Sequence, residues 1–381
     1  RFISETVGAK VSWEEGNQSI TVVWEGFYPP DEKDLLSSRL LPQPKIEWSQ
    51  QMSSQGVQRS AFIQSTIDGG YILCGSHEDA HDQSGVYIVK LTGEGKPEWE
   101  KTLIKEEGYS FGVYVNQTAD NGYLVVGNYV NPLQINLCDI ILYRLNTQGD
   151  LLWEKSIGGE REDTVLSVEI TKDRGHLLTG YSDSYSEPYQ QEDILLIKID
   201  ESGNVLWQNT YGNVGADWGK DCFESQEGEL LISGSTENKQ GKQEIFLMKT
   251  DPEGKVIWKQ TYGRKGNNTI NAMIESNDNG YVLTGETDIY SDSEGIYLFK
   301  TDRYGKVLWE KYYEKNGSTI AYSIAKTNSG GFLIAGSTNV TIDDLLSESG
   351  NADGYLLFTD AYGNKIWDQV LEGDKHDSLY C

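Results

Sequence analysis

DRYGKVLWEKYY, residues 302–313, joins a turn at Asp302 to Gly305 with a short strand that carries Trp309. Versions of this stretch recur along the chain, and each places a Trp on the strand: Trp48, Trp99, Trp153, Trp207, Trp258, Trp309 and Trp367. Consecutive Trp residues are 51, 54, 54, 51, 51 and 58 positions apart. A period of about fifty residues indicates a repeat protein, in which each repeat is one structural unit.

Each repeat reads as four β-strands. In the third repeat we expect strands at 163–170, 176–180, 193–199 and 204–211, rich in β-branched residues and bounded by Gly, Asp or Ser. Four antiparallel strands per repeat make one blade of a β-propeller. The sequence therefore predicts an all-β fold with six complete blades.

The two ends of the repeat region supply parts of a seventh blade. The strand of Trp48 has no preceding partner strands, and the tail DKHDSLYC resembles the start of a first strand. We expect the ring to close through an N-terminal outer strand, with the last blade cut short. The alternative is a ring of six blades with frayed ends.

Residues 1–25 follow another pattern, and we assign them to a separate small α+β unit. A short helix is expected around Phe2, Ile3 and Val7, followed by two strands, 11–13 and 19–24, with alternating apolar residues. FISE, GAKVSW and ITV resemble the C-terminal half of the copper amine oxidase N-terminal-like (stalk) domain of Gram-positive bacteria. The resemblance implies an extracellular or cell wall-associated protein and no copper, because the four His residues lie outside this stretch. Residues 26–44, with four Pro among charged residues, predict a linker, and the propeller is assigned to 45–381.

The charge composition argues against two classes of binding partner, nucleic acids and anionic membranes. With 59 acidic and 32 basic residues, the net charge of −27 would repel nucleic acid and anionic membranes. No apolar run reaches the length of a membrane span. Four scattered Cys form no disulfide framework. We expect a monomer that binds a protein, peptide or carbohydrate.

The repeated turn and Trp have a structural interpretation. Asp or Asn at the first turn position accepts backbone N–H bonds, and Gly at the fourth takes a positive φ. Each Trp is expected to pack against the neighbouring blade. Calcium in these turns is the alternative, but they lack a dense Asp ligand set, and we predict no cofactor or metal.

TDRYGKVLWEK and TDPEGKVIWKQ resemble the Asp-x-x-Gly-Lys-x-x-Trp docking motif of PQQ-type (quinoprotein-like) propeller repeats. The resemblance covers residues 45–381. Enzymes of that family add an adjacent Cys pair and a calcium-bound quinone; this sequence has no adjacent Cys pair. The double Gly at 69–70 and 330–331 also resembles kelch repeats.

A basic column lies nine residues before each Trp: Lys90, Arg144, Lys198, Lys249 and Lys300, with Phe358 in the sixth repeat. We interpret it as repeated ion pairs or carbonyl contacts rather than a ring of ligands.

Candidate ligand-binding residues lie where first and third strands begin and in the long loops between second and third strands. They are Asp139, Asp163, Asp193, Asp217, Glu244, Asp353, Tyr129, Tyr185 and Tyr189. All are expected on one face of the propeller, where variable loops are typical of a binding surface. The alternative is a solvated acidic rim without a ligand. A further alternative is a metal at His77 and His81.

No catalytic motif was found, so no catalytic residue is predicted. The hypothesis is a non-catalytic secreted or cell-surface binding module. The alternative is a quinoprotein-like or glycan-active enzyme with its site in the axial channel.

Overall fold

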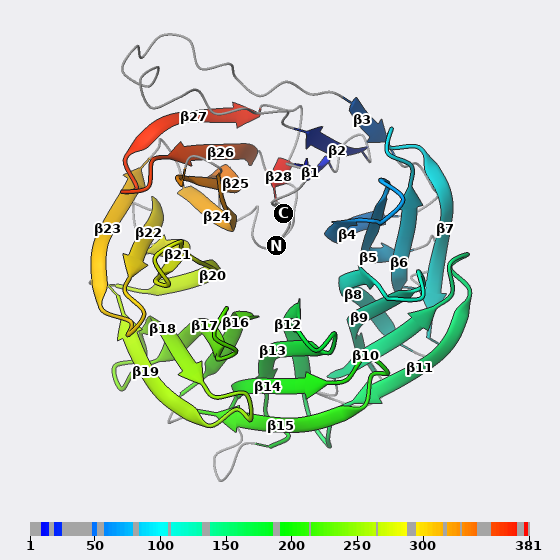
Figure 1. Ribbon diagram of the computed structural model, residues 1–381, viewed down its shortest axis with the longest axis horizontal. Helices are drawn as coiled ribbons and strands as arrows, with labels where there is room; N and C mark the ends of the chain where they lie inside the picture. The colour runs from blue at the N-terminus through cyan, green and yellow to red at the C-terminus, as the bar shows by residue number, and fades with distance from the viewer. Residues whose placement is uncertain are drawn as a thin grey trace.

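Seven antiparallel sheets of four strands surround one axis and form a β-propeller (Figure 1). The computed structural model describes residues 9–14, 19–24, 48–51, 57–78, 84–105, 108–131, 138–185, 191–212, 215–263, 266–287, 295–314, 318–327, 330–340, 352–371 and 377–379. The described residues contain strands and turns and no helix. The predicted all-β propeller is confirmed.

Six blades follow the chain, each with its first strand innermost and its fourth outermost (Figure 1). Blade 1 is β4 (Val57–Ser65), β5 (Tyr71–Glu78), β6 (Ser84–Leu91) and β7 (Pro97–Ile104). Blade 2 is β8 (Tyr109–Gln117), β9 (Tyr123–Val130), β10 (Cys138–Leu145) and β11 (Leu151–Ile157). Blade 3 is β12 (Asp163–Ile170), β13 (His176–Ser182), β14 (Asp193–Ile199) and β15 (Val205–Tyr211).

The next three blades repeat this order. Blade 4 is β16 (Asp217–Glu224), β17 (Leu230–Glu237), β18 (Gln243–Thr250) and β19 (Val256–Tyr262). Blade 5 is β20 (Asn268–Glu275), β21 (Tyr281–Thr287), β22 (Gly295–Thr301) and β23 (Val307–Glu314). Blade 6 is β24 (Ser318–Lys326), β25 (Phe332–Val340), β26 (Asp353–Thr359) and β27 (Lys365–Leu371).

Blade 7 combines strands from distant parts of the sequence. Its order is β28 (Asp377–Leu379), β1 (Ala9–Glu14), β2 (Ser19–Trp24) and β3 (Trp48–Gln51). Ser12 pairs with Leu379, and Val22 pairs with Trp48. The expected inner strand from the C-terminal stretch and the expected outer strand at Trp48 are both present.

The separate unit expected for residues 1–25 differs from this arrangement. The two predicted strands form, and they pair with each other, but they are the middle strands of blade 7. Alternating apolar residues predict a strand with two different faces and do not identify its partner. The helix expected at residues 1–8 and the linker expected at 26–44 lie outside the described residues.

Five Trp residues of the motif lie beside the turn glycine of the next blade: Trp99, Trp153, Trp207, Trp258 and Trp309. A Cβ at Gly203 would lie 2.6 Å from the ring of Trp153, and a Cβ at Gly363 would lie 2.7 Å from that of Trp309. Gly203 and Gly363 both have a φ of +72°. The glycine therefore allows the turn and also leaves room for the indole.

The basic column forms ion pairs with acidic residues of the first-to-second-strand turns. Lys90, Lys198 and Lys300 lie 3.0, 2.8 and 2.7 Å from Asp68, Asp173 and Asp278, respectively. Arg144 pairs with Asp120 in the same way. Lys90 also donates to the carbonyl of Leu91. These contacts confirm ion pairs and carbonyl contacts as the role of the column.

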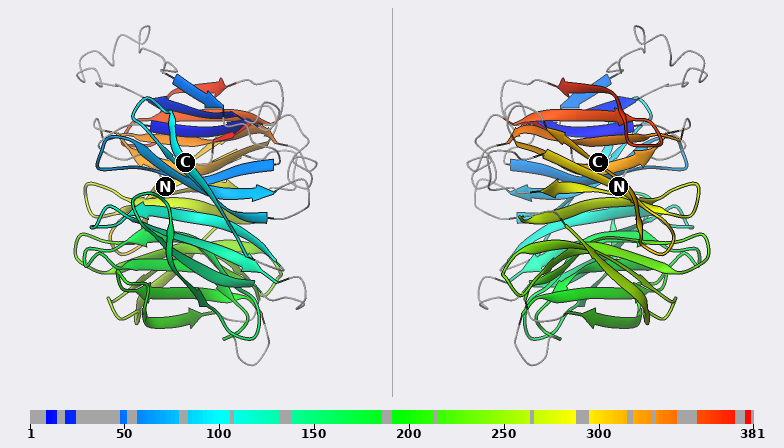
Figure 2. Two further views of the ribbon diagram at one scale, coloured as in Figure 1. Left: turned by 90° about the vertical axis from the view of Figure 1, so that its right-hand side faces the viewer. Right: turned by 90° about the vertical axis from the view of Figure 1, so that its left-hand side faces the viewer.

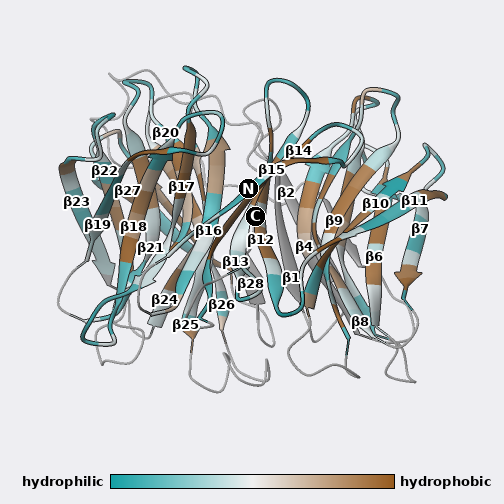
Figure 3. Ribbon diagram, turned by 90° about the horizontal axis from the view of Figure 1, so that it is seen from below, coloured by the Kyte–Doolittle hydropathy of each residue, from teal (hydrophilic) through white to brown (hydrophobic). Residues whose placement is uncertain are grey.

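Figure 2 shows the ring from two sides, and in Figure 3 the strands are largely hydrophobic while many of the turns that join them are hydrophilic. Buried polar groups also join blades. Asn128 exchanges two hydrogen bonds of 2.9 Å with the main chain of Val165. Asp221, which is 3% exposed, accepts from the N–H of Met273 at 2.8 Å and from Ser167 at 3.2 Å. Asp221 thus connects blades 3, 4 and 5.

Candidate functional site

The predicted carboxylates lie at the junctions between blades. A third strand of one blade and a first strand of the next begin on the same face, so the residues at these strand starts meet across the junction. Asp139 of blade 2 lies near Asp163 of blade 3, and Asp193 of blade 3 lies near Asp217 of blade 4, close enough for each pair to interact electrostatically. These residues were expected together on one face, and the structure divides them between separate junctions.

Asp139 and Asp163 enclose the main chain at Gly158. A Cβ at Gly158 would collide with Asp139 Oδ1 and lie 3.3 Å from Asp163 Oδ2. Asp163 is fully buried, and its Oδ2 accepts 2.6 Å hydrogen bonds from Gly159 N and Ser184 Oγ. Burial raises the pKa of Asp163 despite these hydrogen bonds. Burial, followed by the charge of Asp163, also raises the pKa of Asp139, while Lys105 acts in the opposite direction.

The next junction contains a lysine. Lys259 Nζ lies 3.9 Å from Asp217 Oδ1 and 4.6 Å from the ring centroid of Phe246. Burial lowers the pKa of Lys259, and the charges of Asp217 and Asp193 partly offset this effect. Burial and the charge of Asp217 raise the pKa of Asp193, with Lys259 opposing them. The lysine therefore offsets part of the repulsion between the two carboxylates.

The other predicted residues lie elsewhere on this face. Glu244 and Asn268 both lie next to Gly263 at the junction of blades 4 and 5. Asp353 accepts a 2.7 Å hydrogen bond from Asn339. Tyr129 is 8% exposed and lies under Lys105, whereas Tyr185 is 38% exposed. Tyr189 lies outside the described residues.

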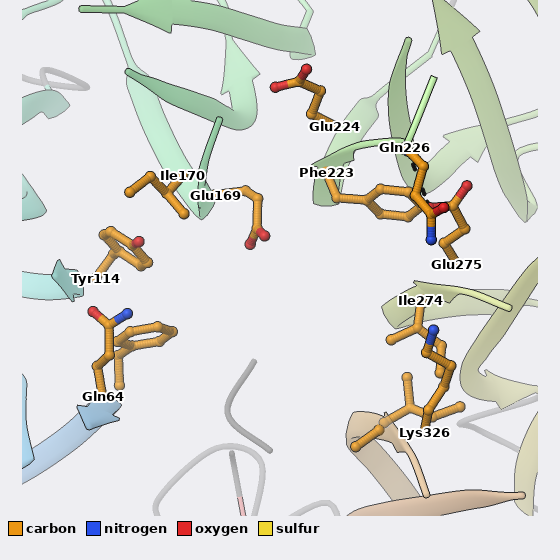
Figure 4. Close-up of a pocket in the computed structure, with 13 residues that line it drawn as sticks. Gln64, Tyr114, Glu169, Ile170, Phe223, Glu224, Gln226, Ile274, Glu275 and Lys326 are labelled. Carbon is orange, nitrogen blue, oxygen red and sulfur yellow. Dashed lines mark hydrogen bonds between the residues drawn. The ribbon is translucent and has the colours of Figure 1, made fainter. Parts of the chain in front are cut away.

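A cavity of about 430 Å³ opens on the axis at the opposite face (Figure 4). Its lining comes from the C-terminal halves of the innermost strands of blades 1–6 and from Gln226, just beyond β16. Because each first strand crosses from one face to the other, these strand ends lie on the face away from the predicted carboxylates. The walls include Phe62, Tyr114, Phe223, Ile274 and Ile324.

Charged side chains surround this apolar wall: Glu169, Glu224, Glu275 and Lys326. Glu224 accepts a 2.9 Å hydrogen bond from the N–H of Lys172 in the preceding blade. Glu275 accepts a weaker one, at 3.3 Å, from the N–H of Gln226. Among the lining residues, three carboxylates and one ammonium group leave a negative balance, which Lys172 Nζ, 3.8 Å from Glu224 Oε1, partly offsets. Two of the carboxylates are also fixed in orientation by main-chain donors.

This cavity was not predicted from the sequence. In the sequence, the middle positions of the first strands are mainly Ser, Ala, Val and Ile, and this composition does not extend to the strand ends. A signal was present, because Glu224 and Glu275 occupy the same final position of their strands. A glutamate at the end of a strand also fits an ordinary solvated turn, so the pattern does not reveal that the ends meet around a cavity.

The cysteine and histidine side chains are the remaining candidates for chemistry. Cys74, Cys138 and Cys222 are buried and form no disulfide within the described residues, and burial raises the pKa of Cys138 to about 11. His81 and the acidic residues beside it lie outside the described residues, so the His77–His81 metal hypothesis stays a prediction. Within the described ranges, no cluster of three or more His, Cys, Asp and Glu side chains is placed to hold a metal. The same ranges contain no helix long and apolar enough to cross a membrane.

Comparisons with known proteins support the fold. No protein-family model matches the chain. An uncharacterized WD repeat-containing protein of Acanthamoeba polyphaga mimivirus is 23% identical over 286 residues, which is 62% of this chain and 19% of that protein. The chain thus spans about a fifth of the length of this relative.

Two solved structures illustrate the structural similarity. Puromycin hydrolase matches with a TM-score of 0.53 and 9% identity, over 97% of this chain and 52% of that one. YCF48 bound to D1 peptide matches with a TM-score of 0.48 and 10% identity, over 86% of this chain and 93% of that one. The chain is similar to β-propellers built from repeated four-stranded blades.

Proposed function

We propose that this protein is a non-catalytic binding module that takes a peptide segment at the axial cavity. The observation that carries the proposal is the combination of apolar walls and carboxylates in one cavity of about 430 Å³. Ligand sites typically have such a volume and a few placed polar groups. The surface of this cavity is more polar than apolar, which suits a ligand that carries charge. This location replaces the loop-rich face as the main binding surface.

The lining favours a ligand that joins an apolar side chain to a positive charge. Phe62, Tyr114 and Phe223 provide aromatic walls, and Glu169, Glu224 and Glu275 provide the negative groups. The net charge of −27 would also attract a basic segment and speed its association. A peptide with Lys or Arg beside an aliphatic or aromatic residue has both features.

The carboxylates at the axial cavity suit a binding role better than acid–base catalysis. Glu224 and Glu275 both direct a carboxylate oxygen to a main-chain N–H of the preceding blade. The same contact is repeated around the ring, since Gln117 accepts from Ile67 N at 2.8 Å. Groups used in this way are fixed in position, which suits recognition.

The test is a peptide array followed by fluorescence anisotropy with the best ligand. Ile170 is 42% exposed at the cavity, so Ile170→Ser should weaken binding without disturbing the core. Glu169→Gln should weaken binding by about tenfold or more, because hydrogen bonds to charged groups contribute about 1.5–3 kcal/mol.

Asp353→Asn on the other face is the matched control and should leave affinity unchanged. Loss of binding in Asp353→Asn with full binding in Ile170→Ser and Glu169→Gln would instead support the loop-rich face. Turnover of alcohol donors in the presence of quinone and calcium would overturn the non-catalytic assignment.

An extracellular or wall-associated location is part of this proposal, and its support is the sequence resemblance of FISE and GAKVSW alone, because the structure places residues 9–14 in blade 7. Fractionation of the producing cells tests it, and recovery of the protein only from the cytosolic fraction would contradict it.

A further inference from the structure

We propose that the junction of blades 2 and 3 binds a divalent cation of the hard, oxygen-liganding class, Ca²⁺ or Mg²⁺, between Asp139 and Asp163. The proposal concerns the face opposite the axial cavity and does not depend on what the cavity binds. It comes from comparing three junctions of the same molecule, which contain the same strand starts and differ in how their charges are compensated.

Two carboxylate oxygens at this junction are buried without a hydrogen-bond partner: Asp139 Oδ1 and Asp163 Oδ1. Asp163 is fully buried, and Gly159 and Ser184 donate to its other oxygen. The Ser182 side chain also favours the charged form of this carboxyl, but burial outweighs these contacts and raises its pKa. A buried carboxylate oxygen without a donor is costly, and such groups are normally paired or bound to a metal. The two oxygens therefore point to a ligand that supplies positive charge.

The neighbouring junction obtains that charge from the protein. Lys259 immediately follows Trp258 and reaches Asp217, with its charge also acting on Asp193. The residue in the same place after Trp207 is Gln208, which is exposed and neutral. At the junction of blades 4 and 5, Asn268 replaces the second carboxylate and the repulsion does not arise. The junction of blades 2 and 3 thus has the paired carboxylates without the lysine.

Lys105, the basic group whose charge acts on Asp139, is engaged with other partners. Lys105 Nζ lies 3.6 Å from Glu154, 3.4 Å from Ser156 and 4.6 Å from the ring centroid of Tyr129. The charge of Asp183 adds to the negative surroundings of Asp163. The balance at the junction stays negative.

Two carboxylates are a normal protein contribution for a hard cation. Mg²⁺ is commonly held by one or two carboxylates and keeps several waters, and Ca²⁺ adds main-chain and water oxygens in flexible numbers.

The experiment measures the thermal midpoint of the whole chain at pH 7.5 in EDTA, CaCl2 or MgCl2, with NaCl matched for ionic strength. A saturating cation should raise the midpoint by about 2–4 °C, since a ligand that binds only the folded state stabilises it. Comparing CaCl2 with MgCl2 identifies the preferred ion. The proposal is overturned if neither ion shifts the midpoint beyond the NaCl control.

Two variants locate the effect. Asp163→Asn should lose the cation-dependent shift. Gln208→Lys places an ammonium group where Lys259 lies in the next blade, and it should also lose the shift while raising the midpoint in EDTA. A variant that merely folded poorly would have a lower midpoint in EDTA. A higher midpoint therefore shows that the protein is folded and that the new ammonium group stabilises the junction. A shift of wild-type size in both variants would assign the cation to another place and refute the site.

The converse variant is Lys259→Gln, which should create a second cation-dependent junction. Its midpoint should fall in EDTA and recover with the cation more than that of the wild type does. Equal recovery in both proteins would contradict the idea that the lysine and the cation have the same role.

Discussion

Gly203→Ala is the perturbation that most directly separates the two roles of the repeated turn glycine. An alanine at a φ of +72° costs about 1–2 kcal/mol in the backbone alone. Its Cβ would also lie 2.6 Å from the Trp153 ring, and overpacking costs about 1–3 kcal/mol more. We expect a total loss of about 2–5 kcal/mol in the free energy of unfolding.

Gly69→Ala is the matched control, because Gly69 has a φ of +80° and a Cβ at this position would have no neighbouring atom within 4 Å. The free energy of unfolding of Gly69→Ala should fall only by the cost of the backbone strain, about 1–2 kcal/mol. The assay is urea unfolding followed by Trp fluorescence and circular dichroism, with coincident transitions as the criterion for two-state behaviour. In a Trp153→Leu background, Gly203→Ala should cost no more than Gly69→Ala. Equal losses for the two alanine variants in the wild-type background would refute the docking of Trp153 on Gly203.

Three further predictions concern buried polar groups. Burial lowers the pKa of His176 to about 4, below its unfolded value of 6.5, so the unfolded chain binds more protons as the pH falls between these values and stability is lost there. Between pH 6.5 and 4, the wild type should lose a free energy of unfolding on the order of 3 kcal/mol through this residue, and His176→Gln should not. Urea unfolding at both pH values measures the difference. Asp221→Ala removes the carboxylate that accepts from the buried N–H of Met273 and should cost about 2–4 kcal/mol in the same assay at pH 7, whereas Asp221→Asn, which keeps an acceptor, should cost less. Asn128→Ala removes both hydrogen bonds to Val165 and should cost about 2–3 kcal/mol, with faster amide exchange at Val165 as its local signature.

Much of the fold could be predicted because it is encoded locally and then repeated. Asp302, Gly305 and Trp309 specify a turn and an outer strand within a few residues, and six copies establish the ring. The basic column was also predictable, since Lys198 and its partner Asp173 belong to the same blade. Closure of the ring was predicted in part. Nothing in the local pattern of residues 9–24 identifies β3 and β28 as their partners, because strand pairing at long range depends on the whole ring.

The site could be predicted less well. Strand starts were correctly expected to carry Asp139, Asp163, Asp193 and Asp217, but which of them meet depends on the contact between consecutive blades. The axial cavity was missed because its lining residues come from six strands about fifty residues apart. The sequence shows that Glu224 and Glu275 occupy equivalent positions at the ends of their strands, but it does not show that these ends meet around a cavity.

The central claim is that the ligand binds at the axial cavity, on the face formed by the first-to-second-strand turns. Hydrogen–deuterium exchange of the full chain with and without a bound basic peptide tests it most directly. We predict slower exchange at 169–172, 223–227 and 274–278, where the strands end around the cavity. Slower exchange confined to the strand starts at 163, 193 and 217, with no change around the cavity, would contradict the account.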